Sequence, residues 1–335
     1  MSHFSGASAM DYVDSELNPV TESVKKKFID LEYHLHNLSG QGEILLLYRG
    51  EELHNIKKRL LKKNPTKKEN ETYERAFYFG DKARHFSVDV FTPGRNYLTN
   101  LNDHSEQTFA FIHARICNIL KEPKLSTRIE KCTDDRFRQY FLRSGSDVDF
   151  MRKSSTCYTE KTKVNVRDYY LYFLHVAGSP GIRKETMLVS TSKDKSIALQ
   201  FSDRTKKEKV IFHYFVPAPF QDYAIGPWEI EHHAKIIYAM GLPAYLPKGL
   251  YPEQNEIAVK GALFPHFLLG IELVRKNKFI INSNFTKMNN MNNIRSIAQH
   301  GFNIDQTDFE KTIFDTGYIR YGETDGKGAF SSYNV

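Results

Sequence analysis

Two polar side chains in the second half of the chain have the types and spacing of a catalytic pair. Gln254 and Glu256 lie two residues apart, where a turn at Pro252 leads into the apolar residues 257–259. Because alternate residues of a β-strand face the same side, both side chains would point into one cleft. A carboxylate there could stabilise a developing positive charge, and an amide could hold an incoming nucleophile. Such pairs also occur on solvated strands, so this pair indicates chemistry only together with other residues.

Two upstream segments offer such residues. Residues 44–50 form an apolar run that contains Arg49, and residues 188–192 form a second run that ends in three hydroxyl side chains. A planar, permanently charged guanidinium suits the oxygens of a diphosphate. On structural grounds alone, Arg49 would be a surface or salt-bridge residue, and the hydroxyl triplet would be a strand end or a helix cap.

Together the three segments resemble the mono-ADP-ribosyltransferases of the Arg–Ser–Glu class, which carry an arginine, an apolar-Ser-Thr-Ser segment and an acidic motif in this chain order. Residues 254–265 are similar to the cholera-toxin version, in which Glu-x-Glu precedes a small-residue turn and a proline; here Gln254 replaces the first glutamate. The resemblance implies an α+β fold, with a split sheet of mixed or antiparallel strands, flanking helices and a large helical insertion. It also implies NAD+ as co-substrate.

The resemblance implies a role for each residue of these motifs. Glu256 would stabilise the oxocarbenium-like state in which the nicotinamide–ribose bond breaks. Ser190 would orient Glu256, and Gln254 would position the acceptor. Further NAD+ contacts are expected from Tyr48, Arg49, Thr191, Ser192, Phe201 and Arg204. Acceptor contacts are expected from Tyr251 and from four lysines of a basic run, namely Lys57, Lys58, Lys62 and Lys63.

Gln254 and the net charge of the chain narrow the class of molecule that would accept ADP-ribose. Within the family, glutamate at this position accompanies arginine modification, whereas glutamine occurs in enzymes that modify other protein side chains and in pierisin-like enzymes that modify guanine in DNA. The chain has a formal net charge of +7, and its basic run suits phosphate contacts, although such runs are often only solvated faces. We therefore expect a nucleobase in RNA or DNA. The alternatives are a non-arginine protein side chain, NAD+ glycohydrolysis, and a non-catalytic nucleic-acid-binding module.

Composition and the N-terminal sequence indicate where in the cell such a protein would act and with which partners. The chain has 335 residues and three cysteines, and its N-terminus shows no secretory signal. No apolar run approaches the roughly 18 residues that span a bilayer. We expect a cytoplasmic protein without membrane contact, such as a toxin of a toxin–antitoxin or antiviral system with an antitoxin or immunity protein as partner. No Cys or His cluster has ligand spacing, so no metal is expected.

The chain pattern predicts the elements that must position these residues. Residues 1–84 would hold a helix and the Arg-bearing strand, 85–165 an inserted helical subdomain, 166–282 the rest of the catalytic core, and 283–335 a C-terminal extension. Apolar periodicity and capping residues predict helices over 18–40, 105–120, from 134 onward, directly after Ser192, and over 294–301. Further strands are expected at 210–216, 234–240, 268–274 and 278–281. Residues 168–176 would form a buried core element that leads back to the sheet, and residues 1–17 a frayed arm.

Overall fold

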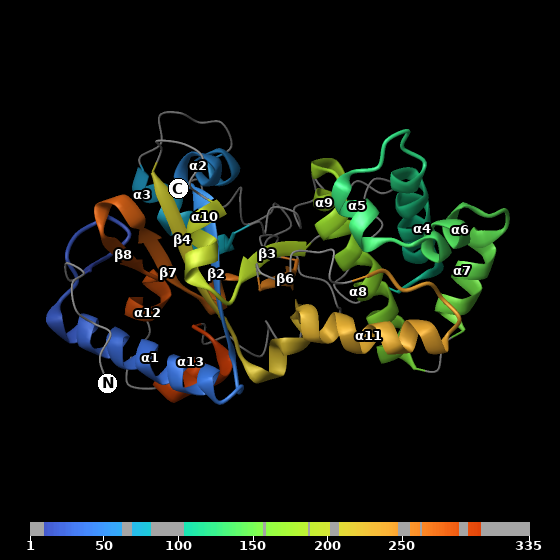
Figure 1. Ribbon diagram of the computed structural model, residues 1–335. Helices are drawn as coiled ribbons and strands as arrows, with labels where there is room; N and C mark the ends of the chain where they lie inside the picture. Colours follow the sequence, from blue (N-terminus) through green and yellow to red (C-terminus); the bar gives the residue numbers. More distant parts are fainter. Residues whose placement is uncertain are drawn as a thin grey trace, which may run out of the picture.

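The computed structural model describes residues 10–61, 69–81, 104–156, 159–186, 188–201, 208–246, 255–261, 263–287 and 294–302. Its centre is a sheet of eight strands in the order β1-β8-β7-β4-β2-β3-β6-β5 (Figure 1). The strands are β1 (Asp11–Val13), β2 (Leu45–Glu52), β3 (Leu188–Ser192), β4 (Lys209–Val216), β5 (Ala224–Ile225), β6 (Glu256–Lys260), β7 (Leu268–Leu273) and β8 (Lys278–Ile281). Neighbouring strands are antiparallel except for the parallel pair β1–β8, so the sheet is mixed.

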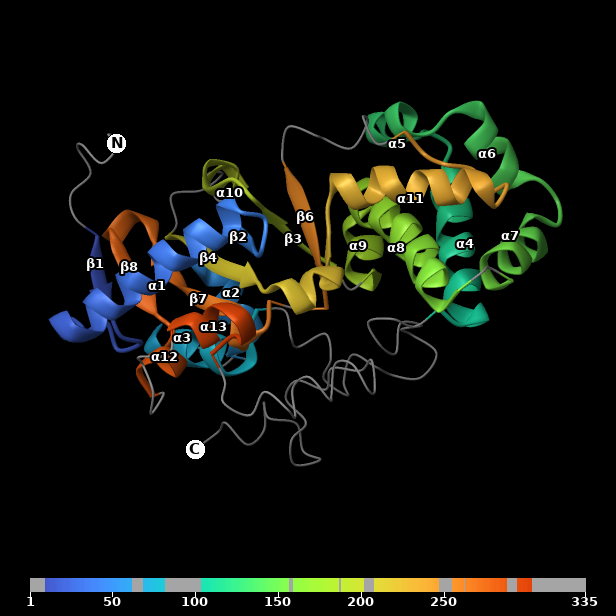
Figure 2. The same ribbon diagram turned by 90° about the horizontal axis from the view of Figure 1, so that it is seen from below.

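The helices confirm the expected α+β class. They are α1 (Glu22–Gly40), α2 (Leu53–Leu60), α3 (Glu69–Phe79), α4 (Glu106–Leu120), α5 (Thr127–Cys132), α6 (Asp135–Leu142), α7 (Ser146–Ser155), α8 (Glu160–Ala177), α9 (Pro180–Glu185), α10 (Lys195–Phe201), α11 (Pro227–Ala239), α12 (Ser283–Lys287) and α13 (Ile294–His300). Figures 1 and 2 show two groups: α1–α3, α10, α12 and α13 around strands β1, β8, β7, β4 and β2, and α4–α9 with α11 on the other side. Strands β3 and β6 lie between the groups.

The sheet is weakly joined at its middle. β2 and β4 pair along eight residues and β3 and β6 along five, whereas β2 and β3 share the single register pair Tyr48↔Ser192. The second half of β2 therefore forms no register pair with β3. A hollow can open between the two strands without any loss of sheet elsewhere.

Helix α1 shows how local sequence builds the larger group. The Thr21 hydroxyl accepts a hydrogen bond from the Val24 backbone N–H and so caps the first turn. Phe28, Leu31 and Leu35, spaced three and four residues apart, are buried, and the Phe28 ring lies 5.4 Å from that of Phe279 on β8. The predicted helix over 18–40 is confirmed, with its start at Glu22 instead of Asn18.

Helix α8 ties the second group to β6. Its residues 166–177 are all buried, which is typical of a helix that is covered on every side. Within it Asp168 accepts a hydrogen bond of 2.9 Å from Arg167 Nε and forms an ion pair with Lys260 of β6. Burial would raise the pKa of Asp168, but the charges of Arg167 and Lys260 outweigh it and lower this pKa. The carboxylate is thus charged where it joins helix to strand.

Several expectations about the elements are wrong. Residues 234–240 are not a strand, because they form the end of α11 and its cap Met240. α11 starts at Pro227 after Gly226, whose N–H donates to Glu229 Oε2 at 2.9 Å. The frayed arm expected over residues 1–17 contains β1, which pairs with β8. The insertion expected over 85–165 stays a prediction; its limit at residue 165 lies within α8.

Candidate active site

A cleft of about 730 Å³ opens where β2 and β3 separate. Its lining side chains come from both groups of elements. They are Tyr48, Arg49, Gly50, Glu51, Arg128, His175, Val176, Arg183, Ser190, Thr191, Ser192, Ile197, Ala198, Gln200 and Glu256. The volume lies within the range of roughly 300–1,000 Å³ that small-molecule sites occupy. Arg49, Ser190 and Glu256, which the sequence places in one site, all line it.

Arg49 reaches across the gap between the strands. Its Nη1 donates to the backbone oxygen of Ser190 at 2.8 Å, its Nε to Asp81 Oδ2 at 3.2 Å, and its Nη2 to Glu51 Oε2 at 3.0 Å. A guanidinium has five N–H donors. Contacts with the residues that the structure describes use three of them, and the other two can donate to a ligand. Glu51 and Asp81 place two carboxylates against the single positive charge of Arg49 and hold its side chain in place.

Glu256, the first residue of β6, faces a buried histidine. His175 Nε2 lies 2.9 Å from Ser190 Oγ and 3.5 Å from Glu256 Oε1. The Glu256 side chain is 14% exposed, which leaves it open to the cleft. Ser190 therefore stands beside Glu256, as the resemblance implies, but it shares that place with a helix residue that the motifs do not contain.

A hydrogen bond at Nδ1 fixes the orientation of the His175 ring. The Thr186 hydroxyl donates to the Arg183 backbone oxygen at 2.8 Å, so at its 3.1 Å contact with His175 it accepts from Nδ1–H. Nε2 then points to the cleft. Nε2 either accepts from the Ser190 hydroxyl or, as an N–H, donates to Ser190 Oγ, and only the N–H form can also bond the Glu256 carboxylate.

Polar neighbours keep Glu256 charged. Burial alone would raise the pKa of Glu256, but hydrogen bonds and charge from His175, hydrogen bonding with Ser190 and the charge of Arg183 together lower this pKa. A carboxylate that is held ionised away from bulk water interacts strongly with a positive charge placed next to it. The cleft thus presents a fixed anion at the end of β6.

The wall opposite β2 carries two more arginines. Arg128 of α5 and Arg183 of α9 both donate to the backbone oxygen of Val176, Arg183 through Nη2 at 3.3 Å. Both side chains line the cleft. Together with Arg49 they give the lining three guanidinium groups against the two carboxylates of Glu51 and Glu256, a balance that slightly favours an anionic ligand.

Close packing of α10 against β2 shapes the floor of the cleft. A Cβ atom added to Gly50 would lie 1.7 Å from the backbone oxygen of Ala198. Only glycine permits this approach, and it brings Ile197, Ala198 and Gln200 to the cleft. The predicted short helix after the hydroxyl triplet is confirmed as α10.

The other residues of the triplet have structural partners. The Thr191 hydroxyl donates to the Ile257 backbone oxygen at 2.7 Å and so ties β3 to β6. Ser192 Oγ accepts from the backbone N–H of Asp194 at 3.0 Å, which is the cap-like role weighed for it above. Tyr48 lines the cleft, and its ring packs edge-on to His213 at 5.1 Å.

Some expected contacts do not line the cleft or lie outside the description. Lys57 pairs with Glu69 at 2.9 Å and Lys58 is solvent-exposed, and neither lines the cleft. Phe201 is the last residue of α10. Gln254, Tyr251, Arg204, Lys62 and Lys63 lie outside the residues that the structure describes.

Sequence reasoning missed the helix residues of the cleft. His175 lies in a segment expected only to supply core packing, and Arg128 and Arg183 fall in no motif. A polar residue within an apolar run was the available signal for His175, because a buried imidazole needs hydrogen-bond partners. For the two arginines the local sequence carries no comparable sign.

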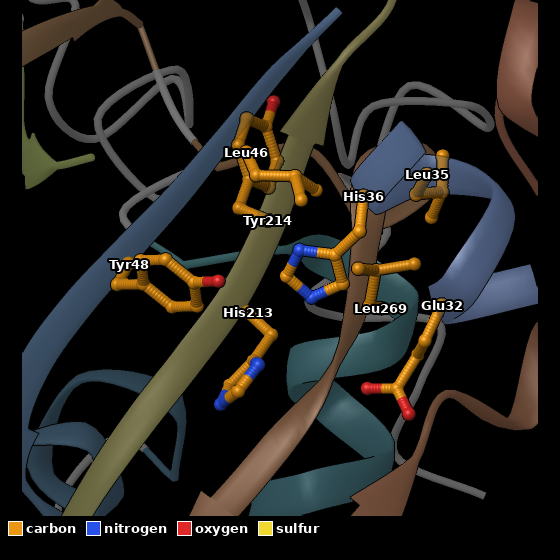
Figure 3. A pocket seen from close by; sticks show the side chains of 8 residues that line it. All are labelled: Glu32, Leu35, His36, Leu46, Tyr48, His213, Tyr214 and Leu269. Carbon is orange, nitrogen blue, oxygen red and sulfur yellow. The ribbon is translucent and has the colours of Figure 1, made fainter. Parts of the chain in front are cut away.

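A second, much smaller cavity lies under Tyr48, on the side of α1 (Figure 3). Its volume is about 10 Å³, roughly the space of a single water. Glu32, His36 and His213 line it together with apolar residues (Figure 3). His213 Nε2 contacts Glu272 Oε2 at 2.8 Å, and Lys195 Nζ contacts the same oxygen at 2.7 Å. This cavity is too small for a nucleotide, so the larger cleft is the candidate site.

Two kinds of feature are not found over the described ranges. No group of three or more His, Cys, Asp or Glu side chains there could hold a metal ion, and no helix there is both long and apolar enough to cross a membrane. Comparison of the chain with models of protein families, with curated proteins and with solved structures gave no match in any of the three.

Proposed function

We propose that this protein transfers ADP-ribose from NAD+ to a macromolecule, with a nucleobase in RNA or DNA as the acceptor. The observation that carries the proposal is that Arg49, Ser190 and Glu256 line one cleft although they come from three strands. Arg49 and the Ser190 carbonyl oxygen that it contacts are 141 residues apart in sequence. A chance match of three short motifs gives no reason for such convergence.

The cleft suits a dinucleotide with two phosphates. Its volume accommodates a ligand of that size, and three guanidinium groups face the opening. Arg49 would hold the diphosphate with its remaining N–H donors, and Arg128 and Arg183 would add charge from the other wall. With the diphosphate bound between the two walls of the cleft, the nicotinamide-side ribose would lie near Glu256, the first residue of β6.

The reaction proposed breaks one bond and forms one. The bond between the ribose C1′ and the nicotinamide nitrogen breaks, and its electron pair leaves with nicotinamide. The ribose then carries positive charge shared by C1′ and the ring oxygen, and the Glu256 carboxylate stabilises that charge. A nucleophilic nitrogen of the acceptor base forms the new bond to C1′ and releases its proton to solvent.

His175 and Ser190 act as positioning residues in this scheme. They hold the Glu256 carboxylate through His175 Nε2, which lies 3.5 Å from Oε1, and through the Ser190 hydroxyl. A carboxylate that is already oriented needs no rearrangement as charge develops, and this preorganisation is what makes electrostatic stabilisation effective.

The acceptor follows from charge and from Gln254. The net charge of +7 favours a polyanionic partner, and glutamine at this position argues against arginine as acceptor by the family resemblance. Such an activity on cellular RNA or DNA would make the protein a cytoplasmic toxin, which its producing cell would have to restrain with an antitoxin or immunity protein.

One experiment tests the proposal. The protein is incubated with NAD+ that carries label on its adenylate part, together with separate pools of RNA, DNA and cell protein. Label in nucleic acid that disappears in Glu256→Gln supports the proposal. Label in protein alone would refute the nucleobase acceptor, release of nicotinamide without labelled macromolecule would make the protein a glycohydrolase, and no consumption of NAD+ would refute the enzyme.

A further inference from the structure

Helix α11 presents an exposed stripe of aromatic and basic side chains. Trp228, the single tryptophan of the chain, is 75% exposed at its first turn, and Tyr238 is 51% exposed at its last. His232 and Lys235 are exposed between them. The spacings of three and four residues put these side chains along one side of the helix, while Ile230, His233 and Ile237 face the core.

The stripe begins next to the catalytic strand. β5 pairs antiparallel with β6 in the register Ala224↔Val259 and Ile225↔Ala258. Gly226 continues this register, since a Cβ added to it would lie 2.6 Å from Ile257 Cδ1. The next residues of the chain, Pro227 and Trp228, therefore start α11 beside Glu256, the first residue of β6. Figure 2 shows α11 leaving this point and running along the second helical group.

The charges along the stripe favour an anion. Lys235 lies at its middle, and the Arg136 guanidinium lies 5.8 Å from the centre of the Tyr238 ring, which extends the basic surface to the far end. Glu231 is exposed three residues after Trp228 and four before Lys235, so it lies within the same stripe, where it offsets the charge of Lys235 and leaves Arg136 as the further cation. Large exposed aromatic side chains that alternate with cations are typical of surfaces that bind single strands, because bases stack on the rings while the cations meet phosphates.

We infer that a single strand of nucleic acid binds along α11, with one base stacked on Trp228 and the neighbouring base directed to Glu256. The inference rests on the proposed function for the identity of the reacting base, and it names Trp228 as an acceptor-binding residue. Trp228 to Tyr238 span about 15 Å, roughly the length of four nucleotides at about 3.4 Å each. A duplex would not fit this surface equally well, because its bases are stacked on one another and unavailable to Trp228.

Intrinsic fluorescence tests the inference at one residue, because Trp228 is the only tryptophan. The protein is titrated with a mixed-sequence 12-nucleotide RNA, the same sequence as DNA, the DNA duplex and inorganic polyphosphate. Single strands are expected to quench the emission, and their affinity is expected to fall as salt rises. The RNA and DNA arms show which sugar is preferred. Polyphosphate supplies charge without bases, so it is expected to cause no comparable quenching.

Variants test the same surface through the affinity of a labelled oligonucleotide. Trp228→Ala is expected to weaken single-strand binding about tenfold or more, and Trp228→Phe to restore most of it, since stacking on a ring is retained. Lys235→Ala is expected to weaken binding less and to reduce the salt dependence by about one phosphate contact. Tyr33→Ala is the matched control, because Tyr33 is 70% exposed on α1, in the other group of elements, and binding should not change.

The outcomes separate this inference from the proposed enzyme. Unquenched emission while labelled single strands bind elsewhere, equal quenching by polyphosphate, or full affinity in Trp228→Ala would refute the role of α11, whether or not NAD+ is consumed. Acceptor activity found only with protein would refute it as well. Quenching by single strands without any release of nicotinamide in a separate NAD+ assay would leave α11 as a binding surface and overturn the enzyme.

Discussion

Arg49 Nη1 donates a hydrogen bond of 2.8 Å to the backbone oxygen of Ser190. In a regular antiparallel pair that continued from Tyr48↔Ser192, Gly50 would lie opposite Ser190. The ladder stops at Tyr48 instead, and the Arg49 side chain spans the gap. Arg49 thus adds a contact between the two halves of the sheet beyond the pair Tyr48↔Ser192, and it supplies charge to the cleft between them.

Arg49→Lys should reduce both stability and NAD+ affinity, although the charge is kept. An ammonium cannot reach Ser190, Asp81 and Glu51 together. Because Asp81 is fully buried, the loss of a charged hydrogen bond should lower the free energy of unfolding by about 1–3 kcal/mol. Urea unfolding and calorimetric NAD+ binding measure the two effects. The exposed Arg295→Lys is the control, and unchanged NAD+ affinity in Arg49→Lys would remove Arg49 from the ligand site.

Glu256→Gln should abolish turnover while NAD+ still binds. The amide keeps the shape of the side chain but carries no charge to stabilise the ribose cation, and loss of one such group costs roughly 10²–10³ in rate. Single-turnover release of nicotinamide and calorimetric binding of NAD+ measure the effect. Glu43→Gln, an exposed change on the approach to β2, is the control. Full activity in Glu256→Gln would show that another group does the chemistry.

His175→Ala should lower kcat more than it raises KM for NAD+, because it releases Glu256 without removing an NAD+ contact. A loss of roughly tenfold to 100-fold is expected for a misplaced catalytic group, and His175→Gln should recover part of it, since its amide can bond Ser190. His113→Ala is the matched control: His113 is also buried, and its Nε2 contacts Ser146 at 2.9 Å within the helical group. It should lose stability but keep turnover per folded molecule. Equal effects of both alanine variants on kcat would reduce His175 to a packing role.

Gly50→Ala should displace α10 from β2. The added methyl would lie 1.7 Å from the Ala198 backbone oxygen, and overpacking of this kind costs about 1–3 kcal/mol. KM for NAD+ should rise as well, because Ala198 and Gln200 line the cleft. Gly40→Ala at the end of α1 meets nothing within 4 Å and should change stability little. If Gly50→Ala and Gly40→Ala both have the melting temperature of the wild type, the close contact of α10 with β2 is not as described.

Stability should fall between about pH 4.5 and pH 7 because of Glu32. Burial raises the pKa of Glu32 to about 7, against a weaker lowering by the hydrogen bond from Tyr12. The folded protein then holds a proton that the unfolded chain has released, so stability is lost as pH rises through this window. The difference between pKa values of 4.5 and about 7 corresponds to a penalty of about 3 kcal/mol above pH 7. Glu32→Gln should raise the melting temperature at pH 7.5 and not at pH 4.5, whereas the exposed Asp30→Asn should do neither. A rise of equal size at both pH values would contradict the assignment.

The sequence predicts most of the sheet because its strands carry strong local signals. Residues 210–216 and 268–274 are apolar runs between turns, and both form strands where expected. The helices α4 and α6 follow from capping side chains at Ser105 and Asp134. Helix α1 follows from its apolar stripe, although its cap is Thr21 and not the expected Asn18. In these segments local preference and burial agree.

The same reasoning fails where burial overrides the pattern. Residues 234–240 are apolar except for Lys235, a run that suits a strand, but the cap at Gly226 and the buried positions of Ile230 and Ile237 accompany a helix here. The aromatic run 168–176 gives no period because it is buried all round in α8. His175 could not be assigned from sequence, since its partner Ser190 is reached only after the chain passes α9 and turns back along β3.

The ion pair of Asp168 with Lys260 fastens the last residue of β6 to α8, and α8 also carries His175. Glu256 and His175 therefore lie on elements that are joined to each other, whereas Arg49 lies on β2, across the seam between β2 and β3. The two sides of this seam are joined by the pair Tyr48↔Ser192, by the hydrogen bond of Arg49 to Ser190 and by the packing of α10 against β2. Widening or narrowing that seam would alter how far the cation stands from Glu256 and leave the alignment of Glu256 with His175 intact. A partner that binds only the outer helices could in this way lower the activity of the site without entering the cleft.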